Sequence, residues 1–399
     1  MTTFIQLHFL TKYPVSNPNR DDLGQPKTVN FWGTPRGRIS SQSLKRAVRT
    51  SEIFREAFTN NPLGVRTKLV GQKIIEHLTG QGVADDKATE VAVALVALLN
   101  DKKAEDEKKN KKGAKNGGKK GSKKGSKKGA DANEVVEDAF GEDVEDIDDN
   151  EESEKSDSAK KIVLETGQLV HLSPFEIDQI MKVATEVANG APVPTSIDVL
   201  LSNKNISPDI AMHGRMMASH PHYTCEAAVQ VSHSITTHAV KVEDDFFSAV
   251  DDWNNANKGS GHIGDRSFLG GGVFHTYVCI NYDLLVSNLG GNTELAKETM
   301  VTFLRAMMED GPRGMQASYG SRVRTGYVLI ERGTQMPFTS QTHFDVPVTG
   351  NDLMLESIKR LRDERDATHA LYDEEIDKIE FGSGLPTKPK DLYDFLRDT

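Results

Sequence analysis

Residues 38–49 read Arg38-Ile39-Ser40-Ser41-Gln42-Ser43-Leu44-Lys45-Arg46-Ala47-Val48-Arg49. On a helical wheel at about 100° per residue, one face carries the glutamine and three cations, and the leucine, alanine and valine lie opposite. Apolar residues continue the second face as far as Phe58, so the pattern predicts one amphipathic helix over 40–58. Free N–H groups and the helix dipole would favour an anion at its serine-rich N-terminus.

The charge around this predicted helix is strongly positive. Between Arg36 and Thr50 the chain has five basic residues and no acidic one, and residues 1–55 hold nine basic residues against three acidic ones. A solvated helix face normally alternates bases with acids, so this face favours phosphate binding over simple solvation. The net charge of the whole chain, −10, averages over segments that need not share a surface.

Outward from this helix, hydrophobic periodicity predicts strands and helices in both halves of the chain. Expected strands cover 3–10, 227–242, 273–282 and 327–330, and expected helices cover 63–78, 84–99, 293–309 and 352–372. A further helix begins after Ser173, with Pro174 in its first position and Glu176 completing a capping box. Strands at both ends bracket a helical middle, which predicts a single α+β domain with a long insertion.

Residues 101–161 differ from the rest of the chain in composition. Thirteen lysines against three acids fill 102–130, and fourteen acids against one lysine fill 131–158. Such blocks cannot bury enough apolar surface to offset the entropy of ordering, so we expect a disordered insertion. It is either a basic arm masked by an acidic block or a solvated linker.

The overall composition excludes several protein classes. The 399 residues include two cysteines, Cys225 and Cys279, too few for a disulfide scaffold. The N-terminus lacks the features of a signal peptide, and the longest apolar run, 91–99, is far shorter than the ~20 residues of a membrane-spanning helix. We therefore expect a cytoplasmic protein without membrane contact.

Two apparent site motifs fail on their context. Residues 259–264 match a dinucleotide-binding fingerprint, but polar residues precede it where a strand is required and no clear helix follows. A flexible loop is the better account of this stretch. His213, His220, His222 and Cys225 lie close in sequence, but their spacing matches no common zinc pattern. We expect no metal, no cofactor and no catalytic residue.

The stretch from Arg38 to Ala47, with Asn19-Arg20-Asp21-Asp22 before it, resembles the CasC family, which forms the backbone subunit of the type I-E CRISPR Cascade complex. Later segments agree in the same order along most of the chain: 209–212 (DIAM), 214–216 (GRM), 234–240 (SITTHAV), 247–252 (FSAVDD) and 272–274 (GVF). The lysine-rich insertion departs from the family pattern.

The resemblance implies an α+β fold with a palm similar to an RNA-recognition motif (ferredoxin-like). The palm would comprise 1–60, 206–241 and 272–399. A helical fingers insertion would cover 61–205, and a thumb β-hairpin would cover 242–271. Copies of such a subunit stack as a filament along a guide RNA, together with other Cascade subunits. The subunit would be non-catalytic and would present the guide for pairing with target DNA, in the cytoplasm.

The resemblance also implies the residues of an RNA site. Contacts with guide phosphates and sugars would come from Arg20, Lys27, Ser40, Gln42, Lys45, Arg46 and Arg49. Such contacts carry no sequence information, which suits a subunit that accepts any guide. Met216 would pack on a displaced nucleotide, and Phe246, Phe247 and Val250 would form the wedge of the thumb. For the two phenylalanines the alternative is core burial, against which the flanking aspartates argue.

Asp21 and Asp22 leave a second function open. Paired acids beside Arg20 could bind Mg²⁺ for RNA cleavage, as in distantly related backbone subunits of other CRISPR types. The alternative, a pair of turn-capping aspartates that supports the arginine, is favoured.

Overall fold

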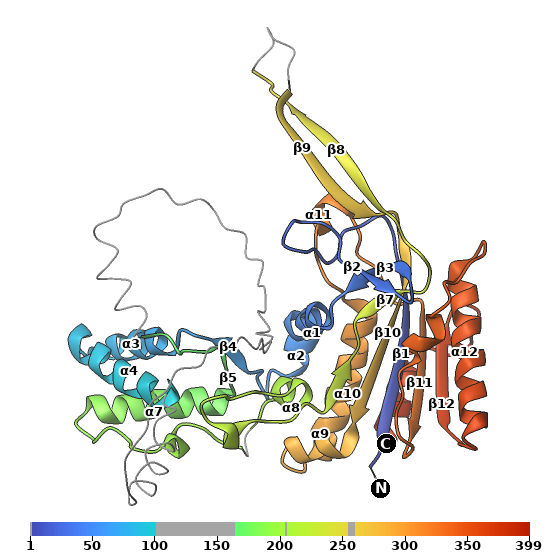
Figure 1. Ribbon diagram of the computed structural model, residues 1–399. Helices are drawn as coiled ribbons and strands as arrows, with labels where there is room; N and C mark the ends of the chain where they lie inside the picture. Colours follow the sequence, from blue (N-terminus) through green and yellow to red (C-terminus); the bar gives the residue numbers. More distant parts are fainter. Residues whose placement is uncertain (1, 101–163, 204–205, 254–259) are drawn as a thin grey trace, which may run out of the picture.

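An antiparallel sheet organises the part of the chain that the computed structural model describes, residues 2–100, 164–203, 206–253 and 260–399 (Figure 1). Within this part the sheet has eight strands in the order β12-β11-β1-β10-β7-β3-β2, with β6 also paired to β10. The strands are β1 (Phe4–Tyr13), β2 (Thr28–Phe31), β3 (Thr34–Ile39), β6 (Val229–Val231), β7 (Ser234–Thr236), β10 (Gly272–Asn281), β11 (Tyr327–Gly333) and β12 (Asp377–Gly382).

Helices cover both faces of this sheet, and we call the sheet with its helices the body. Ile5, Leu7 and Phe9 of β1 share one core with α2 (Glu52–Ala57), α8 (Pro208–His213), α9 (Tyr282–Asn288), α10 (Thr293–Glu309) and α13 (Pro389–Arg397). Leu10 and Leu329 belong to a second core with α12 (Leu353–Leu371). Because both faces are covered, β1 is buried along most of its length. The mixed α+β class expected from the sequence is confirmed.

The predicted helix over 40–58 is two helices, α1 (Ser41–Thr50) and α2. Ser51 separates them, with an extended backbone at φ −64° and ψ 148°. Its hydroxyl accepts a hydrogen bond from Phe54 N at 3.1 Å and donates one to Val48 O at 2.7 Å. The prediction of one continuous helix is therefore wrong, because a serine inside the amphipathic run ends one helix and caps the next.

Residues 65–100 and 164–188 form a helical lobe beside the body (Figure 1). It contains β4 (Val65–Thr67), α3 (Val70–Gly80), α4 (Asp85–Asn100), β5 (Val170–Leu172) and α7 (Pro174–Ala188), which enclose a core of their own. The capping box at Ser173 and the helix over 84–99 are confirmed. The helix predicted over 63–78 begins only at Val70, since β4 precedes it and pairs with β5.

Asn100 joins the two ends of the long insertion. Its Oδ1 accepts a hydrogen bond from Gly167 N at 2.7 Å, and its Nδ2 lies 3.4 Å from Glu165 O. The chain therefore leaves the lobe and returns to it at nearly the same point. The predicted disordered segment, 101–161, lies outside the described residues.

A hairpin projects from the body. Its strands are β8 (Val242–Val250) and β9 (Ser260–Leu269), and they pair with each other and with no other named strand of the described chain (Figure 1). Pairing of Ser16 with Leu269 anchors its base. The fingerprint-like residues 260–264 belong to β9, so the expectation of a flexible loop there is wrong.

The remaining elements differ from the predictions mainly in length. The strand expected over 227–242 is two short strands, β6 and β7, both paired with β10. The expected strands at 273 and 327 and the helices at 293 and 352 are confirmed as β10, β11, α10 and α12. Short elements complete the described chain: η1 (Ile197–Val199), η2 (Pro221–Tyr223), α11 (Gln316–Tyr319) and η3 (Ser340–Phe344). None of the described helices combines the length and apolar character needed to cross a bilayer.

A polar cluster is buried between the sheet and α12. Glu331 on β11 forms an ion pair with Arg365 on α12, and both side chains are almost fully buried. His8 on β1 lies 3.6 Å from the Glu331 carboxylate. His275 on β10 stacks near His8, with ring centroids 6.0 Å apart, and no partner hydrogen-bonds either ring within the described structure.

Candidate nucleic-acid interface

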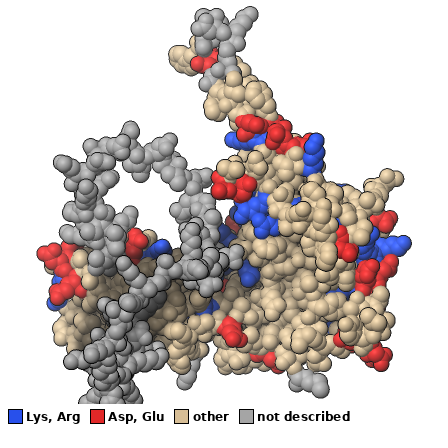
Figure 2. Space-filling view, viewed as in Figure 1, with Lys and Arg blue, Asp and Glu red and all other residues tan. Residues whose placement is uncertain are grey.

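Helix α1 is held by its apolar face, which leaves its polar face outward. Leu44 and Val48 are buried against the body, whereas Gln42 and Arg46 are exposed and Lys45 is half-buried. Figure 2 shows Lys and Arg side chains on the body below the hairpin, on the side that faces the lobe. The predicted separation of an apolar face from a basic one is confirmed within α1.

The N-terminus of α1 is occupied by groups of the protein itself. Ser40 is 8% exposed, and its hydroxyl accepts a hydrogen bond from Ser43 N at 3.3 Å. Ser41 N lies 3.2 Å from His233 Nδ1, and Asn19 Oδ1 accepts from Ser40 N at 2.8 Å. The expectation of an open anion site formed by free amides is therefore wrong, because a cap and a histidine already satisfy two of them.

His233 lies in the field of two cations at this end of the helix. Burial lowers the pKa of His233, and the positive charges of Arg38 and Lys27 lower it further. Neutral His233 accepts from Ser41, so Lys27 and Arg38 contribute the positive charge here. The site therefore extends from α1 toward the strands β2 and β3.

Lys45 and Arg49 are crowded by like charges. Burial lowers the pKa of Lys45, and the nearby charge of Arg66 lowers it further. Arg49 shows the same direction, from burial first and then from Arg66. Among the described residues no carboxylate forms an ion pair with Lys45, Arg46 or Arg66. An uncompensated group of this kind attracts an anion.

Asp209 on α8 is the carboxylate that pairs with Arg49 of this group. It is fully buried, and its Oδ2 lies 3.6 Å from Arg49 Nη1 and 3.0 Å from His171 Nε2. Burial alone would raise the pKa of Asp209, but the hydrogen bonds from His171, from the amide of Gly64 and from Ser207 hold it well below its usual range. Asp209 is therefore ionised. The side chain of Arg49, which lies beside it, is 18% exposed.

Arg66 belongs to the basic group but was not among the residues predicted from the sequence. It lies on β4 of the lobe, is exposed, and its Nε is 3.5 Å from His171 Nδ1. The signal that could have identified it is the pair Arg66 and Lys68 in a stretch that we expected to be helical. Strand pairing of β4 with β5 instead brings Arg66 beside α1.

Arg36, counted above with the basic face, lies elsewhere. It is fully buried and donates to the carbonyl oxygens of Thr236 and Phe344 at 3.0 and 2.9 Å. Its guanidinium also lies over the Phe31 ring. Arg36 therefore connects the sheet to the segment before α12, and it is unavailable to a phosphate.

The loop before β2 holds the remaining predicted cation. Arg20 is exposed, and its Nη1 lies 3.5 Å from Met315 Sδ. Asp21 Oδ1 accepts hydrogen bonds from Leu23 N at 3.0 Å and Gln25 N at 2.8 Å. The turn-capping interpretation of Asp21 is confirmed, but Asp21 contacts the loop backbone, and the arginine is supported by Met315.

The two predicted phenylalanines of the hairpin lie on opposite faces. Phe246 is 70% exposed and shares its face with Ile263, which is 59% exposed. Phe247 covers Gly264 on the other face, with Arg266 4.9 Å from its ring centroid and His262 beyond. Val250 is exposed near the tip. Ile263, missed in the sequence, completes the free apolar face, whereas Phe247 stiffens the hairpin.

Met216 is exposed beside a buried ion pair. Its neighbour Arg215 donates from Nη1 to both carboxylate oxygens of Glu176, at 2.7 and 2.9 Å, and both side chains are buried. Met217 packs into the lobe core on the other side. The backbone of Met216 is thus fixed while its side chain, 77% exposed, points to solvent.

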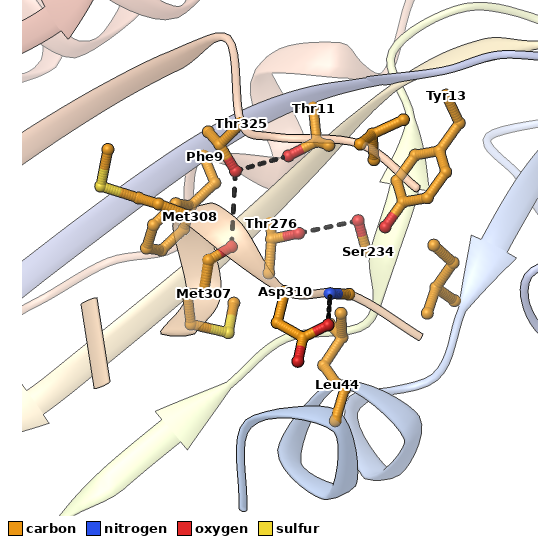
Figure 3. A pocket seen from close by; sticks show the side chains of 14 residues that line it. Phe9, Thr11, Tyr13, Leu44, Ser234, Thr276, Met307, Met308, Asp310 and Thr325 are labelled. Carbon is orange, nitrogen blue, oxygen red and sulfur yellow. Dashed lines mark hydrogen bonds between the residues drawn. The ribbon is translucent and has the colours of Figure 1, made fainter. Parts of the chain in front are cut away.

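A small cavity lies behind α1 (Figure 3). Leu44 and Ala47 form its wall on the helix side, and Ser234, Thr276 and Asp310 line the opposite side. Its volume of about 20 Å³ accommodates about one water molecule. The cavity therefore sits under the apolar face of the helix and does not belong to the basic surface.

The histidines around residue 220 have separate partners. His220 Nε2 lies 2.9 Å from Leu98 O, and His213 packs near the Phe303 ring. Cys225 is buried and its Sγ is 4.0 Å from Ile210 O. His213 and Cys225 therefore contact elements of the body, and His220 contacts the lobe.

Comparison with known proteins decides the family. The model of the CT1975-like proteins matches residues 5–383. The chain belongs to this CT1975-like family of Cas proteins. No curated protein sequence matches it.

Two chains of solved structures are similar to this CT1975-like chain. A chain titled "CRISPR RNA-guided surveillance complex, pre-nicking" is 27% identical, with a TM-score of 0.73 and 99% of each chain covered. A chain titled "CRISPR RNA-guided surveillance complex" is 22% identical, with a TM-score of 0.65 and the same coverage, and this second likeness is one of fold.

Proposed function

We propose that this chain is a Cascade-type Cas protein that binds a guide RNA as the repeated backbone subunit of a CRISPR surveillance complex, in the manner of the CasC subunit of type I-E. The body would act as the palm, the lobe as the fingers and the β8–β9 hairpin as the thumb. Copies would assemble as a filament along the guide, with other Cascade subunits, in the cytoplasm. The guide would then be presented for pairing with target DNA.

The observation that carries this proposal is the uncompensated basic surface of α1. Lys45, Arg46 and Arg66 lie between body and lobe, and Asp209, the carboxylate beside Arg49, is buried and engaged by Arg49 and His171. The family match and the likeness to a chain of a CRISPR RNA-guided surveillance complex support a partner of phosphate chemistry. Contacts of this type bind any RNA sequence.

Salt titration of RNA binding tests the proposal. Binding of a labelled single-stranded RNA is measured from low to high KCl for the full chain and for Lys45→Ala and Arg46→Ala. Each lost phosphate contact should reduce the magnitude of the log–log slope by roughly 0.7. Lys378→Ala, at the far edge strand β12, removes the same charge and should leave the slope unchanged. Equal slopes for all variants would contradict the assignment.

We propose further that the subunit is non-catalytic. Asp21 is committed to capping its turn, which does not favour the alternative of a metal-dependent endoribonuclease. Incubation of RNA with the purified chain and Mg²⁺ tests this directly. Intact RNA is expected, and cleavage that Asp21→Ala abolishes would overturn the proposal.

A further inference from the structure

Four side chains form a continuous relay between the lobe and the body. Arg66 Nε lies 3.5 Å from His171 Nδ1, His171 Nε2 lies 3.0 Å from Asp209 Oδ2, and the same oxygen lies 3.6 Å from Arg49 Nη1. The residues come from β4, β5, α8 and α1. Two arginines from different parts of the fold are thus joined through one histidine–aspartate pair.

The geometry selects one protonation state of His171. Asp209 accepts, so Nε2 carries the proton, and Arg66 donates, so Nδ1 must offer its lone pair. Only the neutral imidazole protonated on Nε2 satisfies both contacts. Burial, the largest effect, lowers the pKa of His171 and agrees with this neutral form, while the hydrogen bond to Asp209 opposes it.

The other oxygen of Asp209 fixes the carboxylate in place. Oδ1 accepts from Gly64 N at 2.8 Å and from Ser207 Oγ at 2.7 Å. A side chain at Gly64 would meet His171, since its Cβ would lie 2.7 Å from Nε2. Arg49 also lies 3.4 Å from Gly64 O. The relay is therefore rigid at its centre, and within the described residues each arginine keeps guanidinium N–H groups without a hydrogen-bond partner.

We infer that His171 and Asp209 are positioning residues that hold Arg66 and Arg49 ready to bind phosphates of single-stranded RNA at the junction of lobe and body. This inference rests on the proposed function and adds Arg66 to its site. An arginine fixed in advance loses less side-chain entropy on binding than a free one. The competing interpretation is a purely structural clasp between lobe and body.

Salt titration of the full chain with labelled oligouridylate separates the two interpretations. Arg49→Gln and Arg66→Gln should each reduce the magnitude of the slope by roughly 0.7. His171→Leu should reduce it as much as Arg66→Gln, and should cause no further reduction in the Arg66→Gln background. Asp209→Asn should reduce the slope as much as Arg49→Gln, and should cause no further reduction in the Arg49→Gln background. Because Asp209→Asn keeps the shape of the side chain, it also serves as the test if His171→Leu does not fold. Lys378→Gln serves as the matched control for lost charge.

The conservative variant His171→Gln provides a rescue. Its amide keeps one donor and one acceptor, so the slope should return toward the value of the unmodified chain, even if its melting temperature stays lowered. Lowered melting temperatures with unchanged slopes for His171→Leu and Asp209→Asn would leave only a structural clasp and overturn the inference. Unchanged slopes for Arg49→Gln, Arg66→Gln and Lys45→Gln together would overturn the proposed RNA site itself.

Discussion

Phe246 and Phe247 are neighbours on β8 of the β8–β9 hairpin, and they have opposite roles. The side chains of a strand alternate between faces, so one ring is free and the other lies on Gly264 beneath Arg266. A glycine weakens a strand because it has no side chain to pack, and here the ring of Phe247 on the opposite strand covers Gly264. The free ring is therefore available to a partner, whereas the covered ring maintains the hairpin.

Replacing each ring by alanine should separate these roles. Phe247→Ala removes a cation–π contact of about 0.5–1 kcal/mol and the cover of Gly264. Amide hydrogen exchange in β8 and β9 should accelerate about two- to fivefold, because an isolated two-stranded ribbon is marginally stable. Phe246→Ala is the matched control and should leave exchange unchanged. Equal acceleration in both variants would contradict this assignment.

His8 should make stability depend on pH. Burial lowers its folded pKa from 6.5 to about 4, so between these values the unfolded chain binds the proton more readily. Stability is thus full above about pH 6.5 and falls as the pH drops toward about 4, by up to about 3 kcal/mol. Urea unfolding at pH 7 and pH 5 measures the loss.

The control for this pH effect is His8→Leu, which removes the titrating ring. Its stability should fall less between pH 7 and pH 5 than that of the unmodified chain. The remaining loss belongs to the other histidines whose pKa values burial lowers, among them His213, His275 and His343. An identical fall with and without His8 would show that its ring does not titrate in this way.

At the same scale, the sequence predicted which residues carry charge but not their surroundings. The basic face of α1 followed from periodicity, because one helix turn determines which side chains share a face. Arg36 could not be separated from that face, since a buried arginine with carbonyl partners has the same letter as an exposed one. Arg66 was missed because its neighbours in space come from a distant strand.

At the scale of elements, α1 and α2 depend on Ser51. Ser51→Ala removes the cap of α2 and the bond to Val48 O, both buried. The free energy of unfolding should fall by about 1–2 kcal/mol. Urea denaturation measures it, with Thr50→Ala as the control, because the Thr50 hydroxyl donates to Arg46 O at an exposed position. The control should change stability by less than about 0.5 kcal/mol.

The elements that were predicted correctly have a strong hydrophobic periodicity in the sequence, and the missed elements have a weak one. Long helices such as α10 and α12 and buried strands such as β10 carry enough apolar residues for a clear signal. The hairpin of β2 and β3 was missed, since its short strands include Pro35 and end in a Trp32-Gly33 turn. β4 was missed because its partner follows about a hundred residues later, beyond any local pattern.

At the scale of the molecule, residues 101–161 should be dispensable for folding. Asn100 bonds Gly167 and Glu165, so the two ends are already together without the insertion. Replacing 101–161 by a short Gly/Ser linker should leave the free energy of unfolding within about 0.5 kcal/mol, because closing a longer loop costs little. Urea denaturation of both chains measures this, and a loss of several kcal/mol would contradict it.

The same deletion tests the basic arm. Binding of duplex DNA at low salt is measured with the full chain and with the shortened one. Weaker binding by the shortened chain would support an arm that adds non-specific affinity, since lysines release counterions from DNA. Equal binding would assign the segment to a linker.

The bond between Asn100 and Gly167 has a practical consequence for labelling. Because the chain exits and re-enters the lobe at one point, a compact foreign domain with adjacent termini can be grafted there in place of 101–161. A fluorescent protein grafted at this point would report on assembly without occupying either terminus of the chain. The residues of the lobe core all lie outside 101–161, so this core would support the grafted domain.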